Sequence, residues 1–160
     1  MRSRFIAGSI AALAFVGTTF AFTASPVSAG GHARDAAVGN VKLNGANEVP
    51  AADPDGRGRF LFVAAGDHLC YIFTAKNIDP PLAAHIHTGA AGVNGGIVVM
   101  LMVPDPVSAE CITAVADESM NSTAVLTQGE LDAIIANPAG FYANVHTAPF
   151  PAGAIRGQLG

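Results

Sequence analysis

Three histidines have the residue type and spacing of a metal site. His85 and His87 stand two positions apart in the run HIH, and on a β-strand such a pair points to one face. His146 lies further along the chain, in phase with Tyr142 and Asn144. If the two strands are neighbours, the three imidazoles converge. Imidazole suits copper and zinc, and three protein ligands with one open position are typical of a reactive metal site.

A purely structural interpretation fits the same residues. His85 and His87 would then hydrogen-bond to turn backbone, and their neighbours would form a polar network on the face of the sheet. The side chains of that network would be Tyr142, Asn144, His146 and Arg156. The sequence leaves the metal site and the polar network open as alternatives.

A weaker metal candidate depends on proteolytic processing. Cleavage after Ala29 would expose Gly30, Gly31 and His32 as a new N-terminus. An amine, two amides and the imidazole of His32 can form a square-planar nitrogen site for copper(II) or nickel(II). Cleavage one residue away would abolish it.

No catalytic constellation accompanies these histidines. Ser108, Ser119 and Ser122 lack a nucleophile elbow, and no carboxylate pair has a recognisable spacing. The glycines of the 89–96 loop have neither the following helix nor the lysine of a phosphate-binding loop. We therefore expect a binding protein rather than an enzyme, and copper or zinc if it carries a cofactor.

The first thirty residues have the pattern of an export signal. Arg2 and Arg4 precede an uncharged apolar run over 5–22, and Val27-Ser28-Ala29 supplies the small residues that signal peptidase requires. The alternative is a membrane anchor, but glycines, serines and threonines dilute the run. We expect a signal peptide over 1–29, a mobile leader over 30–39, one domain over 40–160, and a secreted product that is not an integral membrane protein.

The charge of the remaining chain narrows the class of partner. Without Arg2 and Arg4 it carries six basic and twelve acidic residues, a formal net charge of −6, and the basic residues are scattered singly. Nucleic-acid binding requires clustered Lys and Arg, so no nucleic-acid partner is expected. An extracellular protein, a glycan or a metal ion remains as the ligand.

The two cysteines, Cys70 and Cys111, both lie in the expected domain. In an exported chain such a pair favours a disulfide, which would close a loop of about 40 residues and contribute about 3–4 kcal/mol. We expect the bridge because each cysteine flanks an apolar, strand-like run and two such runs could pack face to face.

The rest of the pattern predicts short strands and one helix. Strands are expected over 40–43, 59–64, 68–75, 83–88, 96–103, 111–116, 123–126, 141–147 and 152–159. The apolar run 69–73 indicates a strand buried on both faces, whereas the alternation over 142–146 indicates one accessible face. Thr127 and Glu130 form a capping box for the helix, which Asn137-Pro138 ends. This spacing is typical of an all-β sandwich or barrel.

Four blocks of sequence resemble CHRD domains, the module named after chordin and widespread in exported bacterial proteins. The blocks are LNGANEVP at 43–50, GRG at 56–58, HIHTGAAGVNGGIVV at 85–99 and YANVHTAPFPAGAIRGQL at 142–159. The resemblance implies an extracytoplasmic, all-β domain whose biochemical activity is poorly defined. Ala154 departs from the pattern, because many relatives carry an acidic residue there.

The resemblance and the spacing together predict an antiparallel β-sandwich or barrel, immunoglobulin-like or superoxide-dismutase-like, with one short helix. Copper–zinc superoxide dismutase is similar in having an H-x-H strand in a β-sandwich, which is an analogy of fold alone.

Overall fold

Eight strands form one antiparallel sheet in the computed structural model, which describes residues 36–160. The order across the sheet is β5-β4-β7-β8-β1-β2-β3-β6. The strands are β1 (Ala37–Asn44), β2 (Arg57–Ala65), β3 (His68–Lys76), β4 (Pro81–Thr88), β5 (Ile97–Leu101), β6 (Val107–Thr113), β7 (Phe141–Thr147) and β8 (Ile155–Gln158). The helical segments are α1 (Gln128–Ala136) and the short 3-10 turns η1 (Gly45–Asn47), η2 (Glu118–Met120) and η3 (Pro138–Gly140). The expected all-β fold with one short helix is confirmed.

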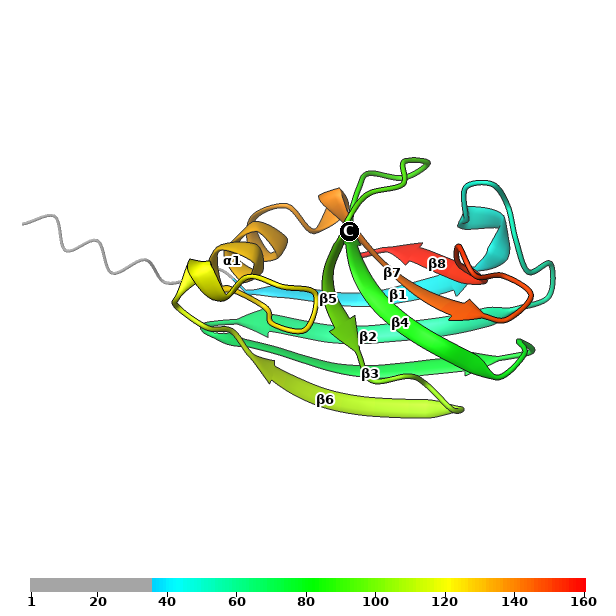
Figure 1. The fold of residues 1–160 in the computed structure, drawn as a ribbon, viewed down its shortest axis with the longest axis horizontal. Helices are drawn as coiled ribbons and strands as arrows, with labels where there is room; N and C mark the ends of the chain where they lie inside the picture. The colour runs from blue at the N-terminus through cyan, green and yellow to red at the C-terminus, as the bar shows by residue number, and fades with distance from the viewer. Residues whose placement is uncertain (1–35) are drawn as a thin grey trace, which may run out of the picture. The chain divides into compact units, whose positions relative to one another are not determined.

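The sheet curls so that its two halves face each other. Strands β1, β2, β3 and β6 form one half, and β5, β4 and β7 cross in front of it (Figure 1). β8 joins the halves: it pairs along β7 but meets β1 at a single position, Asn44 opposite Arg156. The short contact lets the sheet turn sharply there, which gives a half-closed barrel.

The hydrophobic core fills the space between the halves. Phe60 and Phe73 contribute from β2 and β3, and Ile86 and Val145 contribute from β4 and β7; all four side chains are fully buried. The two phenylalanine rings meet edge to face, with centroids 5.0 Å apart. Alternate residues of β2 and β3 thus supply the core, as period-two patterning requires.

Helix α1 begins and ends as the sequence predicts. The Thr127 hydroxyl accepts from the backbone N–H of Glu130, whose carboxylate accepts from the backbone N–H of Thr127. This reciprocal capping box satisfies two N–H groups that the first helical turn leaves unpaired. Leu131 and Ile134 are fully buried and attach the helix to the core.

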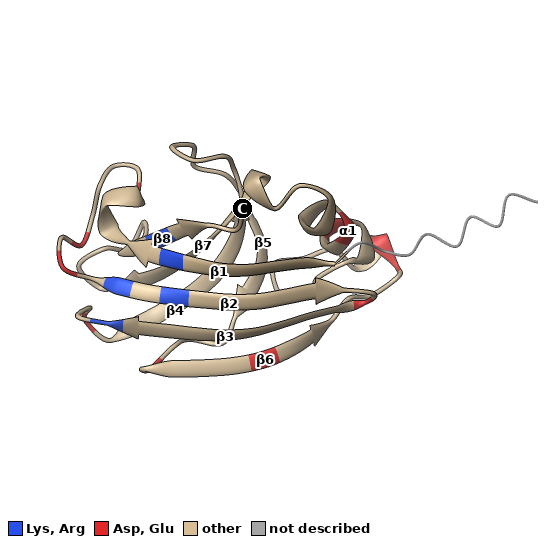
Figure 2. Cartoon of the chain, turned by 180° about the vertical axis from the view of Figure 1, so that it is seen from behind, with Lys and Arg blue, Asp and Glu red and all other residues tan. Residues whose placement is uncertain are grey.

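Strand β3 is buried on one face only, so the expected two-sided burial is wrong. Leu69, Tyr71 and Phe73 point into the core, whereas Ile72 is 48% exposed. The outer face of β1, β2, β3 and β6, meaning the face turned away from the core, is not covered by another layer of the described chain (Figure 2). An apolar run on such a strand places half of its side chains in solvent.

Strand β7 differs from its prediction in the opposite sense. Both faces are buried, including the polar residues Tyr142, Asn144 and Thr147. The face expected to be accessible packs against the Arg156 side chain and the glycine-rich 89–96 loop. Polar alternation therefore marks a covered polar site here and not a solvated surface.

The disulfide between Cys70 and Cys111 is confirmed. The two residues lie directly opposite each other in the β3–β6 ladder, with Cα atoms 3.9 Å apart. The bridge thus joins neighbouring strands of one sheet on its outer face and ties the edge strand β6 to β3.

The expected strand over 123–126 is wrong. This segment makes only an isolated bridge between Ser122 and Val125, and the carbonyl of Thr123 accepts from the N–H of Met100. A tight turn at this place prevents a continuous ladder. Among the described residues no helix has the length and apolarity needed to cross a membrane.

Candidate metal centre

Strands β4 and β7 bring the three histidines to one face of the sheet. The two strands are antiparallel neighbours, and His85 lies opposite Asn144, His87 opposite Tyr142, and His146 opposite Ala83. Residues in this register share a face, and here it is the face turned away from Ile86 and the core. One nitrogen of each imidazole lies within 4.8 Å of the others.

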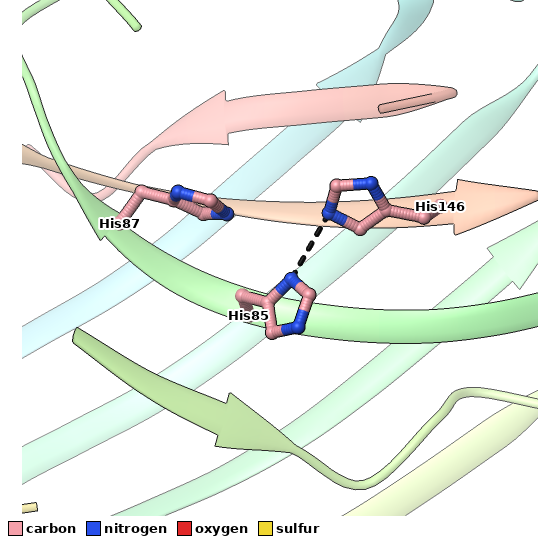
Figure 3. A group of neighbouring side chains, drawn as sticks. All are labelled: His85, His87 and His146. Atoms are coloured by element: carbon pink, nitrogen blue, oxygen red, sulfur yellow. Dashed lines mark hydrogen bonds between the residues drawn. The ribbon is translucent and has the colours of Figure 1, made fainter. Parts of the chain in front are cut away.

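The closest approach in the cluster joins His85 and His146. Nδ1 of His85 lies 3.0 Å from Nε2 of His146, and the rings are turned toward each other (Figure 3). The His87 ring stands edge-on to that of His85, with centroids 5.4 Å apart. His85 and His87 are buried and His146 is half-buried, so the cluster is shielded but reachable from one side.

Backbone carbonyls orient two of the three imidazoles. Nδ1 of His87 lies 3.1 Å from the carbonyl oxygen of Gly95, and Nδ1 of His146 lies 3.0 Å from that of Pro151. A carbonyl only accepts, so each Nδ1 carries the proton and each Nε2 keeps a lone pair. Nε2 of His87 is buried without a hydrogen-bond partner among the described residues. This is the outer-shell pattern of metal-binding histidines.

Burial favours the neutral form of two of the three imidazoles, those of His85 and His87. Burial lowers the pKa of His85 to about 4, with further lowering by the neighbouring His146 and His87. Burial also lowers the pKa of His87, although its hydrogen bond to Gly95 opposes the shift. Neutral imidazole is the form that binds a metal ion, and the lowered pKa values mean that His85 and His87 are already uncharged at neutral pH.

The predicted polar network adjoins the histidines. The Tyr142 ring stacks on His87, with centroids 4.9 Å apart and planes 3° from parallel. The Arg156 guanidinium lies 4.0 Å from the Tyr142 centroid, and its Nη1 donates to Oδ1 of Asn94 at 2.9 Å. Asn144 is buried between the strands, and its Oδ1 makes no well-aligned hydrogen bond among the described residues, although its side chain lies close enough to His87 to oppose the lowering of that residue's pKa. The three histidines and the polar network are therefore neighbouring parts of one structure.

The glycine-rich loop shapes one wall of this site. Where the chain leaves β4, Gly89 adopts φ +138°, a backbone conformation that residues other than glycine rarely adopt. A Cβ at Gly95 would overlap the carbonyl of Thr88, so only glycine lets the loop approach the strand closely enough. That approach places the Gly95 carbonyl on Nδ1 of His87.

The remaining histidines lie apart from the cluster. His68 is exposed at the start of β3, 3.3 Å from Asp67, and Nδ1 contacts the Thr113 hydroxyl. His32 lies outside the described residues, as do the expected signal peptide and the first part of the expected leader; β1 itself begins at Ala37.

Three neighbours of the site are not among the residues predicted from the sequence. The carbonyls of Gly95 and Pro151 act through backbone, which residue type does not reveal. Met100 lies opposite His85 in the β4–β5 ladder and is half exposed on the same face. Its position depends on strand order, although a methionine near an H-x-H strand could have been weighed as a soft ligand.

Comparison with known families agrees with the blocks noted in the sequence. A sequence model of the CHRD domain matches residues 40–159. No match was found among curated proteins or among solved structures. The matched region contains all three clustered histidines, the disulfide and the Arg156 strand. The chain belongs to the CHRD domain family.

Proposed function

We propose that this CHRD domain is an exported, non-catalytic binding module whose ligand is a copper or zinc ion held by His85, His87 and His146. The observation that carries the proposal is the orientation of the imidazoles. Two of them donate Nδ1–H to backbone carbonyls and so keep an Nε2 lone pair, and one of these nitrogens is buried without a partner among the described residues.

The geometry requires only a small adjustment to bind an ion. Three nitrogens about 2.0–2.1 Å from a tetrahedral zinc ion are about 3.3 Å from one another. The ligand atoms here lie within 4.8 Å of one another, and His85 and His146 are already 3.0 Å apart. Side-chain rotations can close the difference without moving the strands. Three protein ligands leave one position open for water or for a transferred ligand.

Export is supported by features independent of the histidines. The first 29 residues have the signal-peptide pattern, and a disulfide joins Cys70 and Cys111. A secreted metal-binding module fits storage or transfer of the ion. The alternative to a non-catalytic role is redox activity, which requires that the ion is copper and that a substrate reaches its open position.

Metal titration of variants tests the proposal. All proteins carry His32→Ala, because a Gly-Gly-His terminus would bind copper independently. The parent should bind one copper(I), copper(II) or zinc(II) ion per chain, and His85→Ala and His146→Ala should each lose more than the roughly 10–100-fold that removal of an outer partner costs. His68→Ala is the matched control, since His68 is exposed and away from the cluster.

The same titration distinguishes the alternative function. If the cluster serves only as a polar network, all four proteins will bind copper and zinc equally weakly. The His85–His146 contact would then be a structural hydrogen bond, and His85→Ala would lower thermal stability without affecting metal content.

A further inference from the structure

The fold gathers the basic residues that are scattered singly in the sequence. Within residues 36–160, all the lysines and arginines except the buried Arg156 are exposed, and they lie together on the outer face of β1, β2 and β3 (Figure 2). These four cations are Lys42, Arg57, Arg59 and Lys76. Residues that are scattered singly in the sequence therefore form a basic cluster in the fold, because the strand register brings them together.

The register places like charges directly opposite each other. Lys42 lies opposite Arg59 in the β1–β2 ladder, and Arg57 lies opposite Lys76 in the β2–β3 ladder. Two cations facing each other across neighbouring strands destabilise a sheet. None of the four forms an ion pair with a carboxylate of the described chain. The arrangement thus costs folding free energy that an external anion would recover.

The four cations line a groove of about 740 Å³. Asn44 lies opposite Arg57 and Thr74 lies opposite Arg59, so these two side chains add hydrogen-bonding groups at the ends of the rows of charge. Val107 and Pro106 form the rim of the groove at β6. Asp55, Asp79 and Asp105 stand in the loops near the ends of these strands and leave the middle of the groove positive. The groove is thus a positive surface on a chain whose formal net charge is negative.

We propose that this groove binds an anionic polysaccharide, a chain of sugars that carry sulfate or carboxylate groups. Two adjacent rows of cations, each extended at one end by a neutral hydrogen-bonding side chain, match a linear polymer with repeated charges and hydroxyl groups between them. The site is separate from the histidine cluster, so the polysaccharide and metal proposals can fail independently.

The surface fits two other polyanions less well. Single-stranded nucleic acid is bound on aromatic side chains that stack with the bases, and the exposed large apolar residues of the described chain are all aliphatic or methionine. Membrane surfaces are anchored by Trp or Tyr at the interface, whereas the apolar residues beside the groove, such as Leu61 and Ile72, lie on a sheet face and do not project from a loop.

Binding to dextran sulfate, with neutral dextran as the matched polymer, tests the proposal. The wild type should bind dextran sulfate in a salt-dependent manner and should not bind dextran. Lys42→Gln/Arg59→Gln should weaken binding and reduce the slope of log affinity against log salt by about 2. The variant should remain folded with an equal or higher melting temperature, because a like-charge pair has been removed.

A second double variant controls for net charge. Met120→Glu/Ala133→Glu changes the charge by the same amount at exposed positions away from the groove. It should retain the wild-type affinity to within a small factor. Equal weakening in both double variants would overturn the groove. Tighter binding to an oligothymidylate or to phosphatidylglycerol vesicles than to dextran sulfate would overturn the assignment to a polysaccharide.

Discussion

Nδ1 of His85 lies 3.0 Å from Nε2 of His146, although 61 positions separate the two residues in the chain. The His146 Nδ1–H is already directed to the Pro151 carbonyl, so its Nε2 can only accept. His85 must therefore donate from Nδ1 when no ion is bound. A metal ion bound at Nδ1 would take the place of this proton, and His85 would then carry its proton on Nε2 or turn its ring.

Met100 provides a test of which ion the cluster prefers. It lies opposite His85 on the same face, and a thioether is a soft ligand that suits copper(I) better than zinc(II). We expect Met100→Leu to weaken copper(I) binding and to leave zinc(II) binding unchanged, as measured by competition with a chromophoric chelator. Met102→Leu, also half exposed on this part of the chain, is the matched control. Equal affinities for copper(I) in all three proteins would exclude the thioether as a ligand.

Gly95→Ala tests whether the loop orients His87. The added Cβ would overlap the Thr88 carbonyl, so the loop must move and carry the Gly95 carbonyl away from Nδ1 of His87. Loss of such an outer partner should lower metal affinity by about 10–100-fold. Gly96→Ala is the control, since a Cβ there meets open space. If Gly95→Ala binds metal as tightly as Gly96→Ala, the backbone acceptor is not needed.

Local features of the fold could be predicted from the sequence. The capping box of Thr127 and Glu130 depends on residues three positions apart, and the common face of His85 and His87 depends on a period of two. Both are decided within a few residues, so spacing suffices. That His146 and Asn144 share one face of a strand could be predicted in the same way.

Features that depend on which strands are neighbours could not be predicted. The side chains of β3 gave no sign that one face lacks a covering layer, and those of β7 gave no sign that Arg156 and the 89–96 loop cover its polar face. The cluster of Lys42 with Arg59 is also a consequence of register. Each of these required long-range pairing, which periodicity does not specify.

Arg156 stabilises the polar side of β7 through its planar guanidinium. It is almost fully buried, stacks on Tyr142 and donates to Asn94. Arg156→Leu removes the stacking and the charge-assisted hydrogen bond, so we expect the free energy of unfolding to fall by roughly 1–3 kcal/mol in chemical denaturation. Arg156→Lys keeps the charge without the plane and should remain destabilised. A Leu variant as stable as the wild type would show that this contact contributes nothing.

Glu48 gives the domain a pH dependence that can be isolated. Its carboxyl is buried, and its Oε1 lies against Gly153 without a hydrogen-bond partner among the described residues. Burial raises the pKa of Glu48 to about 7, although the nearby Arg156 lowers it in part. The folded state therefore holds the proton at a pH where the unfolded chain, with its ordinary pKa of 4.5, has lost it.

The sign of the effect follows from proton linkage. The raised pKa of Glu48 stabilises the fold fully below about pH 4.5, and this contribution is lost as the pH rises to about 7. The Glu48→Gln variant cannot ionise at this position. The difference between its free energy of unfolding and that of the wild type should therefore increase by on the order of 2–3 kcal/mol as the pH rises from about 4.5 to about 7. His85, whose pKa is lowered to about 4, contributes the opposite slope but is present in both proteins and cancels. Urea unfolding of the two proteins with a chelator, at about pH 4.5 and about pH 8, measures the difference. A stability difference independent of pH would show that Glu48 ionises normally in the folded protein.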